Sequence, residues 1–239
     1  MQVLAFASQK GGSGKTTLSG HIAVEAELAG DGPVVMVDTD PQGSLANWWS
    51  ERASPTPAFA QSSMARLLND LTKARAKGFK LAVIDTPPAF TTAIQSVIAL
   101  ADLVVVPTRP SPHDLHAVAA TVELIEQNAK PLVFVVNAAT RRARITADAA
   151  VALSQHGTVA PQTIHQRVDF AVSMIDGQTV GELDPKSLSK SEISALWIYL
   201  RDRLRRCPPN AMGQPRTDRA LFHAPNRAVF GRRNIALRK

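Results

Sequence analysis

The sequence predicts an α/β fold, in which helices flank a doubly wound, mostly parallel sheet. Short apolar runs alternate with helical patterns over residues 1–206 of the 239-residue chain, and this alternation is typical of βαβ units. The runs are continuously apolar, as at 34–37 and 103–106. Continuous runs are typical of parallel strands that helices cover on both faces. A chain of this length can form one large domain with its own core.

The expected elements follow one another in a regular order. An apolar run predicts the first strand at 2–8, and a helical pattern follows at 15–29 until a turn signal at 30–33 ends it. The other expected strands are 33–38, 57–60, 80–85, 102–107, 131–137 and 158–163. The other expected helices are 43–52, 63–77, 91–100, 113–128, 144–155 and 188–206. Helices thus fit between successive strands, as a doubly wound sheet requires.

The last expected helix, 188–206, carries an apolar stripe at helical spacing. The stripe consists of Ile193, Leu196, Trp197, Leu200 and Leu204. Residues 207–239 contain four prolines and no periodicity, so we expect a flexible tail after a domain that spans 1–206. The tail holds seven basic residues and one acidic residue, whereas the rest of the chain holds 20 and 19. The net charge of +7 therefore lies mostly in the tail.

The loop at 9–17 reads Gln-Lys-Gly-Gly-Ser-Gly-Lys-Thr-Thr and joins the first strand to the first helix. Its glycines allow backbone N–H groups to surround a phosphate chain, and the helix adds the positive end of its dipole. Lys15 would reach the β- and γ-phosphates, and the Thr16 hydroxyl can ligate Mg²⁺. The sequence therefore predicts a P-loop NTPase fold that binds ATP and Mg²⁺. The expected nucleotide-binding residues here are Gly11, Gly12, Ser13, Gly14, Lys15, Thr16 and Thr17.

Acidic residues follow the second and fourth expected strands. Asp38 and Asp40 lie at the end of the run 33–38, and Asp85 ends the run 80–85. Open α/β sheets bind ligands beyond the carboxyl ends of their strands. An Asp at the end of a buried strand can reach Mg²⁺ directly or through water. We therefore expect these carboxylates beside the phosphate loop, although a simple turn would also use Asp40 and Pro41.

The phosphate loop departs from the general pattern, because a lysine, Lys10, precedes its glycines. The segment Lys-Gly-Gly-Ser-Gly-Lys-Thr-Thr at 10–17 and the segment Asp-Thr-Asp-Pro-Gln-Gly at 38–43 resemble the deviant Walker A loop and the second signature of the ParA/MinD family of ATPases. The likeness is closest to small ParA-type partitioning ATPases that lack an N-terminal helix-turn-helix domain, and it covers about residues 1–206.

This resemblance implies a catalytic set of Lys10, Lys15 and Asp40, in which Asp40 orients or deprotonates the attacking water. Magnesium would be held by Thr16, Asp38 and Asp85, partly through water, and Asn137 would contact adenine. Lys10 would cross a two-fold interface to the partner's phosphates. The resemblance therefore implies that ATP joins two copies into a homodimer and that slow hydrolysis, stimulated by a ParB-like or other adaptor protein, releases them.

The resemblance also implies DNA binding without sequence preference, which requires clustered basic residues that meet phosphates. The candidates are Arg141, Arg142, Arg144, Arg167, Lys186, Lys190, Arg201 and Arg205. The single cysteine, Cys207, excludes an internal disulfide and favours a reducing compartment. We thus expect a cytoplasmic, nucleoid-associated protein whose cargo is a plasmid, a chromosome or a protein cluster.

Two other functions use the same loop. A MinD-like membrane-positioning ATPase would need a C-terminal amphipathic helix, and Pro225 interrupts the segment between Phe222 and Phe230, so a membrane partner is not expected. A metabolic ATP-dependent ligase of the same fold would depend on a small substrate. Iron–sulfur carriers are excluded because they need paired cysteines.

Overall fold

The computed structural model describes residues 1–88 and 92–207. Its strands are β1 (Gln2–Phe6), β2 (Val34–Asp38), β3 (Ala58–Gln61), β4 (Leu81–Asp85), β5 (Leu103–Thr108), β6 (Leu132–Val136) and β7 (Thr158–Val159). Its helices are α1 (Lys15–Leu28), α2 (Ser44–Ser50), α3 (Leu67–Ala76), α4 (Thr92–Leu100), α5 (Pro112–Gln127), α6 (Arg144–Ser154), α7 (Val168–Ile175), α8 (Val180–Leu183) and α9 (Leu188–Arg206).

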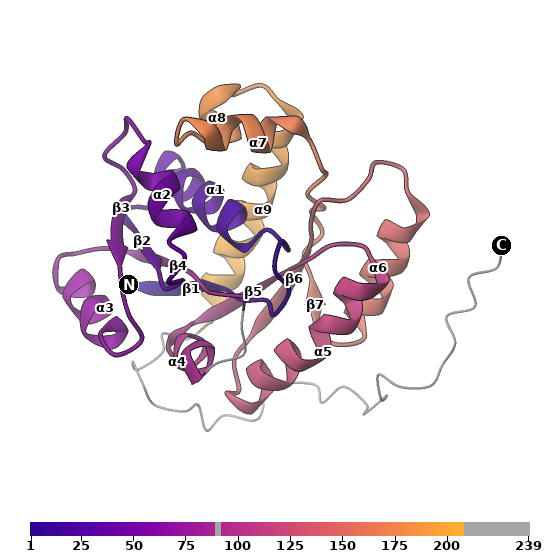
Figure 1. Cartoon of the computed structure of the whole chain (residues 1–239), viewed down its shortest axis with the longest axis horizontal. Helices are drawn as coiled ribbons and strands as arrows, with labels where there is room; N and C mark the ends of the chain where they lie inside the picture. The colour runs from indigo at the N-terminus through magenta and orange to yellow at the C-terminus, as the bar shows by residue number, and fades with distance from the viewer. Residues whose placement is uncertain (89–91, 208–239) are drawn as a thin grey trace.

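The seven strands form one sheet in the order β3-β2-β4-β1-β5-β6-β7 (Figure 1). All the strand pairs in the described part of the chain are parallel. Strands β2 to β4 lie on one side of β1, and β5 to β7 lie on the other. This arrangement confirms the predicted doubly wound α/β fold of P-loop NTPases.

Helices cover both faces of the sheet (Figure 1). Helices α1 and α9 pack on one face, and α3, α4, α5 and α6 pack on the other. Strand β1 shows why its run is continuously apolar: Leu4 and Phe6 belong to the core under α1 and α9, whereas Val3 and Ala5 belong to the opposite core. Successive side chains of β1 point to opposite faces of the sheet, and both faces are buried. No position along the strand is therefore left for a polar residue.

The observed elements differ from the predicted ones in two ways. The seventh strand is short, since only residues 158–159 pair with β6, whereas the sequence predicted 158–163. Helices α7 and α8 were not predicted. For α8 a signal was available, because Thr179 and Glu182 form a reciprocal capping box at its start. The predicted tail beyond Cys207 lies outside the described residues.

The register of the sheet creates one shared edge for the site. Asp85 at the end of β4 pairs with Phe6 of β1 on one side and with Asp38 of β2 on the other. The phosphate loop leaves β1 at the same edge. The topology therefore places the predicted carboxylates and the loop together.

Candidate nucleotide and magnesium site

The phosphate loop depends on glycines at two positions. Gly12 and Gly14 have φ angles of 73° and 99°, a left-handed conformation that side chains disfavour. At Gly14 an added Cβ would also collide with the Nδ2 atom of Asn137. Helix α1 begins directly afterwards, at Lys15, so the N–H groups of its first turn point toward the loop.

Lys15 is buried inside the loop, where its Nζ donates a hydrogen bond of 3.4 Å to the carbonyl oxygen of Lys10. Burial lowers the pKa of the Lys15 ammonium, and the carboxylates of Asp85 and Asp40 oppose this shift. A buried ammonium with a long hydrogen bond to one carbonyl is poised to bind a more strongly charged acceptor. Phosphate oxygens satisfy this requirement.

Asp85 is fully buried at the end of β4 and accepts a hydrogen bond of 2.6 Å from the Thr16 hydroxyl through Oδ2. Its other oxygen, Oδ1, has no hydrogen-bond partner in the described part of the chain. Burial raises the pKa of Asp85 to about 7; the Thr16 hydrogen bond opposes this rise, and the charge of Asp38 adds to it. A carboxylate oxygen left alone in such a place fits a divalent cation.

The residues at this edge fit Mg²⁺ bound together with a nucleotide. No group of three or more His, Cys, Asp or Glu within residues 1–88 and 92–207 forms a complete metal cage. Mg²⁺ ordinarily uses one or two protein ligands and takes the rest from water and phosphates. The Thr16 hydroxyl and the Asp85 carboxylate would hold such an ion only when phosphates complete its shell.

Asp38 fixes the loop that carries Asp40. Its two oxygens accept hydrogen bonds from the backbone N–H groups of Asp40, at 2.9 Å, and Ala46, at 3.0 Å. Burial raises the pKa of the Asp38 carboxyl, and these two N–H groups oppose the rise. A place for Asp38 in the magnesium shell stays a prediction. Asp40 is only partly buried, and its Oδ1 accepts from the backbone N–H of Gln42 at 2.9 Å.

Asn137 braces the phosphate loop from the end of β6. Its Nδ2 donates a hydrogen bond of 2.7 Å to the carbonyl oxygen of Ser13, and its backbone N–H donates to the carbonyl oxygen of Thr108 at 2.9 Å. The sequence did not predict this bracing role. The predicted contact between Asn137 and adenine stays a prediction.

A hollow of about 250 Å³ lies over the loop. Its lining consists of Gly12, Gly14, Lys15, Thr16, Thr17 and Arg109. The sequence predicted all of these except Arg109, which comes from the turn after β5. Lys10 is exposed and is not part of this lining, and neither are Gly11 and Ser13. The two lysines of the loop therefore face different surroundings.

The eight basic candidates for DNA binding divide into two groups. Four of them pair with acidic side chains: Arg167 with Glu192, Lys190 with Glu25, and Arg201 and the still exposed Arg205 with Asp31. The other four are Arg141, Arg142, Arg144 and Lys186, which are exposed. Only Arg144 of these four has an ion pair among the described residues, with Asp148 at 3.8 Å on the surface. The second group is therefore the more available for an external phosphate.

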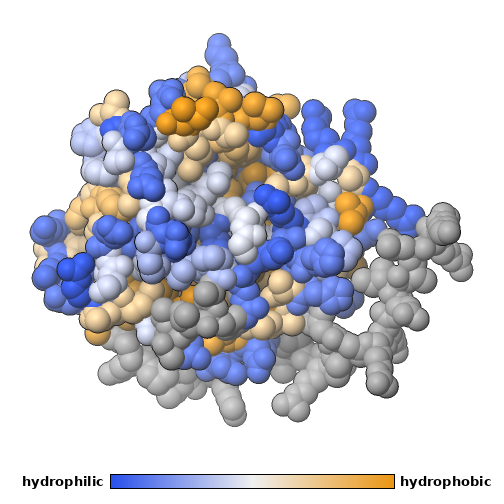
Figure 2. Space-filling model, viewed as in Figure 1, coloured by the Kyte–Doolittle hydropathy of each residue, from blue (hydrophilic) through white to orange (hydrophobic). Residues whose placement is uncertain are grey.

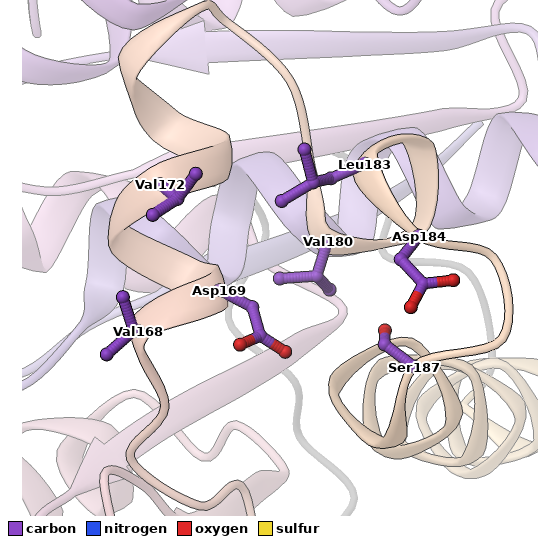
Figure 3. Close-up of a pocket in the computed structure, with 7 residues that line it drawn as sticks. All are labelled: Val168, Asp169, Val172, Val180, Leu183, Asp184 and Ser187. Carbon is purple, nitrogen blue, oxygen red and sulfur yellow. The ribbon is translucent and has the colours of Figure 1, made fainter.

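A second hollow, of about 330 Å³, lies between α7, α8 and the start of α9 (Figure 3). Val168, Val172, Val180 and Leu183 line it together with Asp169, Asp184 and Ser187. Helix α7 turns an apolar stripe outward, since Val168, Val172 and Ile175 are 75%, 43% and 70% exposed. Figure 2 shows hydrophobic surface over this part of the molecule. Exposed apolar patches of this kind mark contact surfaces for other molecules.

His21 links this surface to the phosphate loop. It is buried in α1, its Nδ1 lies 2.7 Å from the carbonyl oxygen of Thr17, and its Nε2 accepts from the backbone N–H of Val180 at 3.2 Å. The ring also packs against Phe170 of α7. Burial lowers the pKa of His21 to about 4, so the imidazole is neutral at neutral pH.

No helix in the described part of the chain is long and apolar enough to span a membrane.

Comparison with known proteins identifies relatives over most of the chain. The family model of the CobQ/CobB/MinD/ParA nucleotide binding domain matches residues 4–180. The Maintenance of carboxysome distribution protein A of Halothiobacillus neapolitanus is 30% identical over 199 residues, which covers 79% of this chain and 91% of that protein. The protein of the same name from Gloeobacter kilaueensis is 44% identical over 124 residues. That match covers 51% of this chain and 55% of the relative, so the chain spans about half of it.

Solved structures show the same fold. A substituted McdA from Cyanothece in complex with ATP superposes with a TM-score of 0.69 at 17% identity, covering 86% of this chain and 96% of that one. The septum site-determining protein MinD of Pyrococcus horikoshii, solved with Mg-ADP, gives a TM-score of 0.70 at 15% identity, covering 86% and 97%. At these identities the likeness concerns the fold.

Proposed function

Because the chain belongs to the CobQ/CobB/MinD/ParA family of nucleotide-binding proteins, we propose that it is a ParA-like ATPase that positions a cargo. It dimerises with ATP, binds DNA without sequence preference and is stimulated to hydrolyse ATP by a partner protein. The observation that carries this proposal is the placement of the two loop lysines: Lys15 lines the hollow, whereas Lys10 is exposed outside it.

The hollow and the carboxylates beside it support ATP hydrolysis. Lys15 binds the phosphate oxygens, and Thr16 and Asp85 hold the Mg²⁺ ion. Mg²⁺, when bound with ATP, neutralises charge on the phosphates. Asp40, on the loop fixed by Asp38, orients the attacking water. Because these groups mainly position and neutralise, the isolated protein should turn over slowly.

The surface supports a dimer. Lys10 lies outside the hollow of its own subunit, so it is available to bind the phosphates of ATP held by a second copy. The ATP would then lie between the two copies. The apolar stripe of Val168, Val172 and Ile175 on α7 offers area that a second copy would bury. His21 joins the opposite side of α7, through Ser173 and Phe170, to helix α1, which begins at the phosphate loop. Nucleotide state and dimerisation would be linked through this contact.

The exposed cations support DNA binding. Arg141, Arg142 and Lys186 project from loops and have no ion pairs among the described residues. The tail 207–239, which lies outside the described residues, contains seven basic residues and one acidic residue. Contacts of this kind are made to phosphates and carry no sequence information. We therefore place the protein on the nucleoid in the cytoplasm.

The relatives favour a protein assembly as cargo. Two of them are named for carboxysome distribution, although others are named ParA of Rhizobium radiobacter and chromosome-partitioning ATPase Soj of Thermus thermophilus. The nucleotide chemistry does not depend on the size or shape of the cargo. The same ATP-dependent switch would therefore serve a protein assembly, a plasmid or a chromosome. A protein cluster is the cargo that we propose.

Electrophoretic retention of random-sequence DNA tests this function. We expect retention with ATP, none with ADP, and a steep loss with added salt, since each neutralised phosphate releases counterions. Arg141→Gln with Arg142→Gln should weaken retention, whereas Arg66→Gln, an exposed arginine directly before α3, should not. Equal retention with ADP would overturn the switch. Binding of liposomes with ATP, without DNA retention, would favour the MinD-like alternative.

A further inference from the structure

We propose that Arg109 is a second phosphate-binding cation of the nucleotide site, and that it contacts the α- and β-phosphate oxygens that ATP and ADP share. This inference rests on the proposed nucleotide function. Arg109 belongs to neither the two loop lysines nor the three carboxylates, and it lies in the turn between β5 and α5.

The order of the strands places Arg109 opposite the magnesium ligands. Strands β2 and β4, which end in Asp38 and Asp85, lie on one side of β1. Strand β5 lies on the other side of β1, and Arg109 follows its last residue, Thr108. The phosphate loop leaves β1 between them. One wall of the site is therefore acidic and suited to Mg²⁺, and the other wall carries an arginine.

Arg109 lines the hollow over the phosphate loop. The residues around it are Gly12, Gly14, Lys15, Thr16 and Thr17. In a loop of this type the backbone N–H groups surround the α- and β-phosphates, whereas the lysine reaches toward the γ-phosphate. A guanidinium on the side away from the magnesium ligands thus meets the inner phosphates. Its planar fork matches two phosphate oxygens at once.

The backbone that carries Arg109 is fixed to the phosphate loop. Asn137 donates one hydrogen bond to Ser13 of the loop, at 2.7 Å, and another to Thr108, at 2.9 Å. On the other side of Arg109, the backbone N–H of Ser111 donates to the carbonyl oxygen of Arg109 at 2.8 Å, and the Ser111 side chain caps α5. The turn is therefore held in place before any nucleotide arrives, which reduces the entropy lost on binding.

The guanidinium of Arg109 is also free to bind a ligand. Within residues 1–88 and 92–207 it has no ion pair or hydrogen bond, and its side chain is exposed. By contrast, Arg52 and Arg167 are bound to Glu182 and Glu192 inside the fold. Lys15 is the other cationic side chain that lines the hollow, and an unpaired guanidinium beside it is available to bind phosphate oxygens.

Isothermal titration calorimetry with Mg-ADP and with Mg-AMPPNP tests this assignment. We expect Arg109→Gln to weaken the affinity for both nucleotides about tenfold or more, as for loss of a charged hydrogen bond, with the ratio between them unchanged. Arg109→Lys keeps the charge but loses the planar fork of the guanidinium. Its nucleotide affinity should lie between those of the unmodified chain and Arg109→Gln. Arg66→Gln is the matched control and should bind as the unmodified chain does. Thermal unfolding should be unchanged in all three variants.

The two nucleotides separate this inference from the proposed function. ADP binding does not require a dimer, so an unchanged ADP affinity in Arg109→Gln would overturn the assignment. A loss confined to AMPPNP would overturn it too, because Arg109 would then act at the γ-phosphate. If the unmodified chain binds ADP but shows no ATP-dependent DNA retention, the proposed function fails while the effect of Arg109 is still measured. If it binds neither nucleotide, both fail.

Discussion

Asp85 and Thr16, 69 positions apart in the sequence, are joined by a hydrogen bond of 2.6 Å between the Thr16 hydroxyl and the Asp85 carboxylate. The bond ties the end of strand β4 to the first turn of helix α1. It leaves Asp85 Oδ1 buried without a partner among the described residues. This geometry is unfavourable for an ionised carboxylate unless a cation is present.

Asp85→Asn should therefore separate stability from function. Burial raises the pKa of Asp85 to about 7, so at pH 8 the folded, nucleotide-free protein keeps a charge that burial disfavours. The free energy of unfolding at pH 8 should rise in Asp85→Asn, by on the order of a few kcal/mol. Mg²⁺-dependent ATP hydrolysis should be lost in the same variant. Urea denaturation and phosphate release measure the two effects.

The control for this prediction is Asp148→Asn, an exposed carboxylate on α6. It should change neither quantity. A strongly destabilised Asp85→Asn protein would contradict the view that the carboxylate is held for a cation.

Asp40→Ala should keep nucleotide binding and lose hydrolysis. Asp40 is partly exposed, and its side chain bonds only the nearby Gln42 N–H among the described residues, so its removal should leave the hollow intact. Loss of a group that orients water typically costs a factor of about 100 to 10,000 in rate. Single-turnover hydrolysis and calorimetric ATP affinity test the two halves. A normal rate would show that another residue orients the water.

Gly14→Ala should disrupt the loop more than Gly12→Ala does. Both positions have left-handed backbone, which costs a side chain about 1–2 kcal/mol, but only at Gly14 would the new Cβ meet Asn137. ADP affinity should fall further in Gly14→Ala. Adding Asn137→Ala should restore part of it, because the obstructing amide is removed. The same loss in both single variants, with no restoration, would argue against the contact.

His21 should make stability depend on pH. Burial lowers its pKa from 6.5 to about 4, so between these values the unfolded chain binds a proton that the folded chain excludes. His21 should thus contribute a fall of at most ~3 kcal/mol to the free energy of unfolding as the pH drops from about 6.5 to about 4, whereas the raised pKa of Asp85 contributes a rise over the same range. Urea denaturation across this range should therefore show the His21 contribution as the difference in slope between the unmodified chain and His21→Gln. His113→Gln, an exposed control, should keep the slope of the unmodified chain.

The sequence was sufficient to predict the sheet, because its strands are buried on both faces and read as continuous apolar runs. It was also sufficient for the loop and Asp85, since parallel strands bring their ends to one edge. Helix α7 was missed because apolar residues lie on both of its sides and leave no one-sided stripe: Phe170 and Met174 pack on the core, whereas Val168, Val172 and Ile175 are exposed. Arg109 itself was not singled out, because its place in the hollow depends on β5 lying beside β1, and the order of strands is a tertiary property.

The basic residues proposed for DNA binding show a similar limit of prediction from sequence. Arg167 and Lys190 looked available in the sequence, but they lie against Glu192 and Glu25 in the fold. These pairs join residues that are 25 and 165 positions apart, so no local pattern reveals them. Exposure and pairing, rather than charge alone, decide which cations remain for DNA.

The mass of the protein in solution, measured by light scattering after gel filtration, tests most directly whether ATP is shared between two copies. We expect Asp40→Ala to be a dimer with ATP and a monomer with ADP. Adding Lys10→Ala to that variant should return it to a monomer with ATP, although calorimetry should still detect ADP binding, since Lys10 lies outside its own hollow. A monomer in every nucleotide state, or an ATP dimer that persists without Lys10, would contradict the dimer switch.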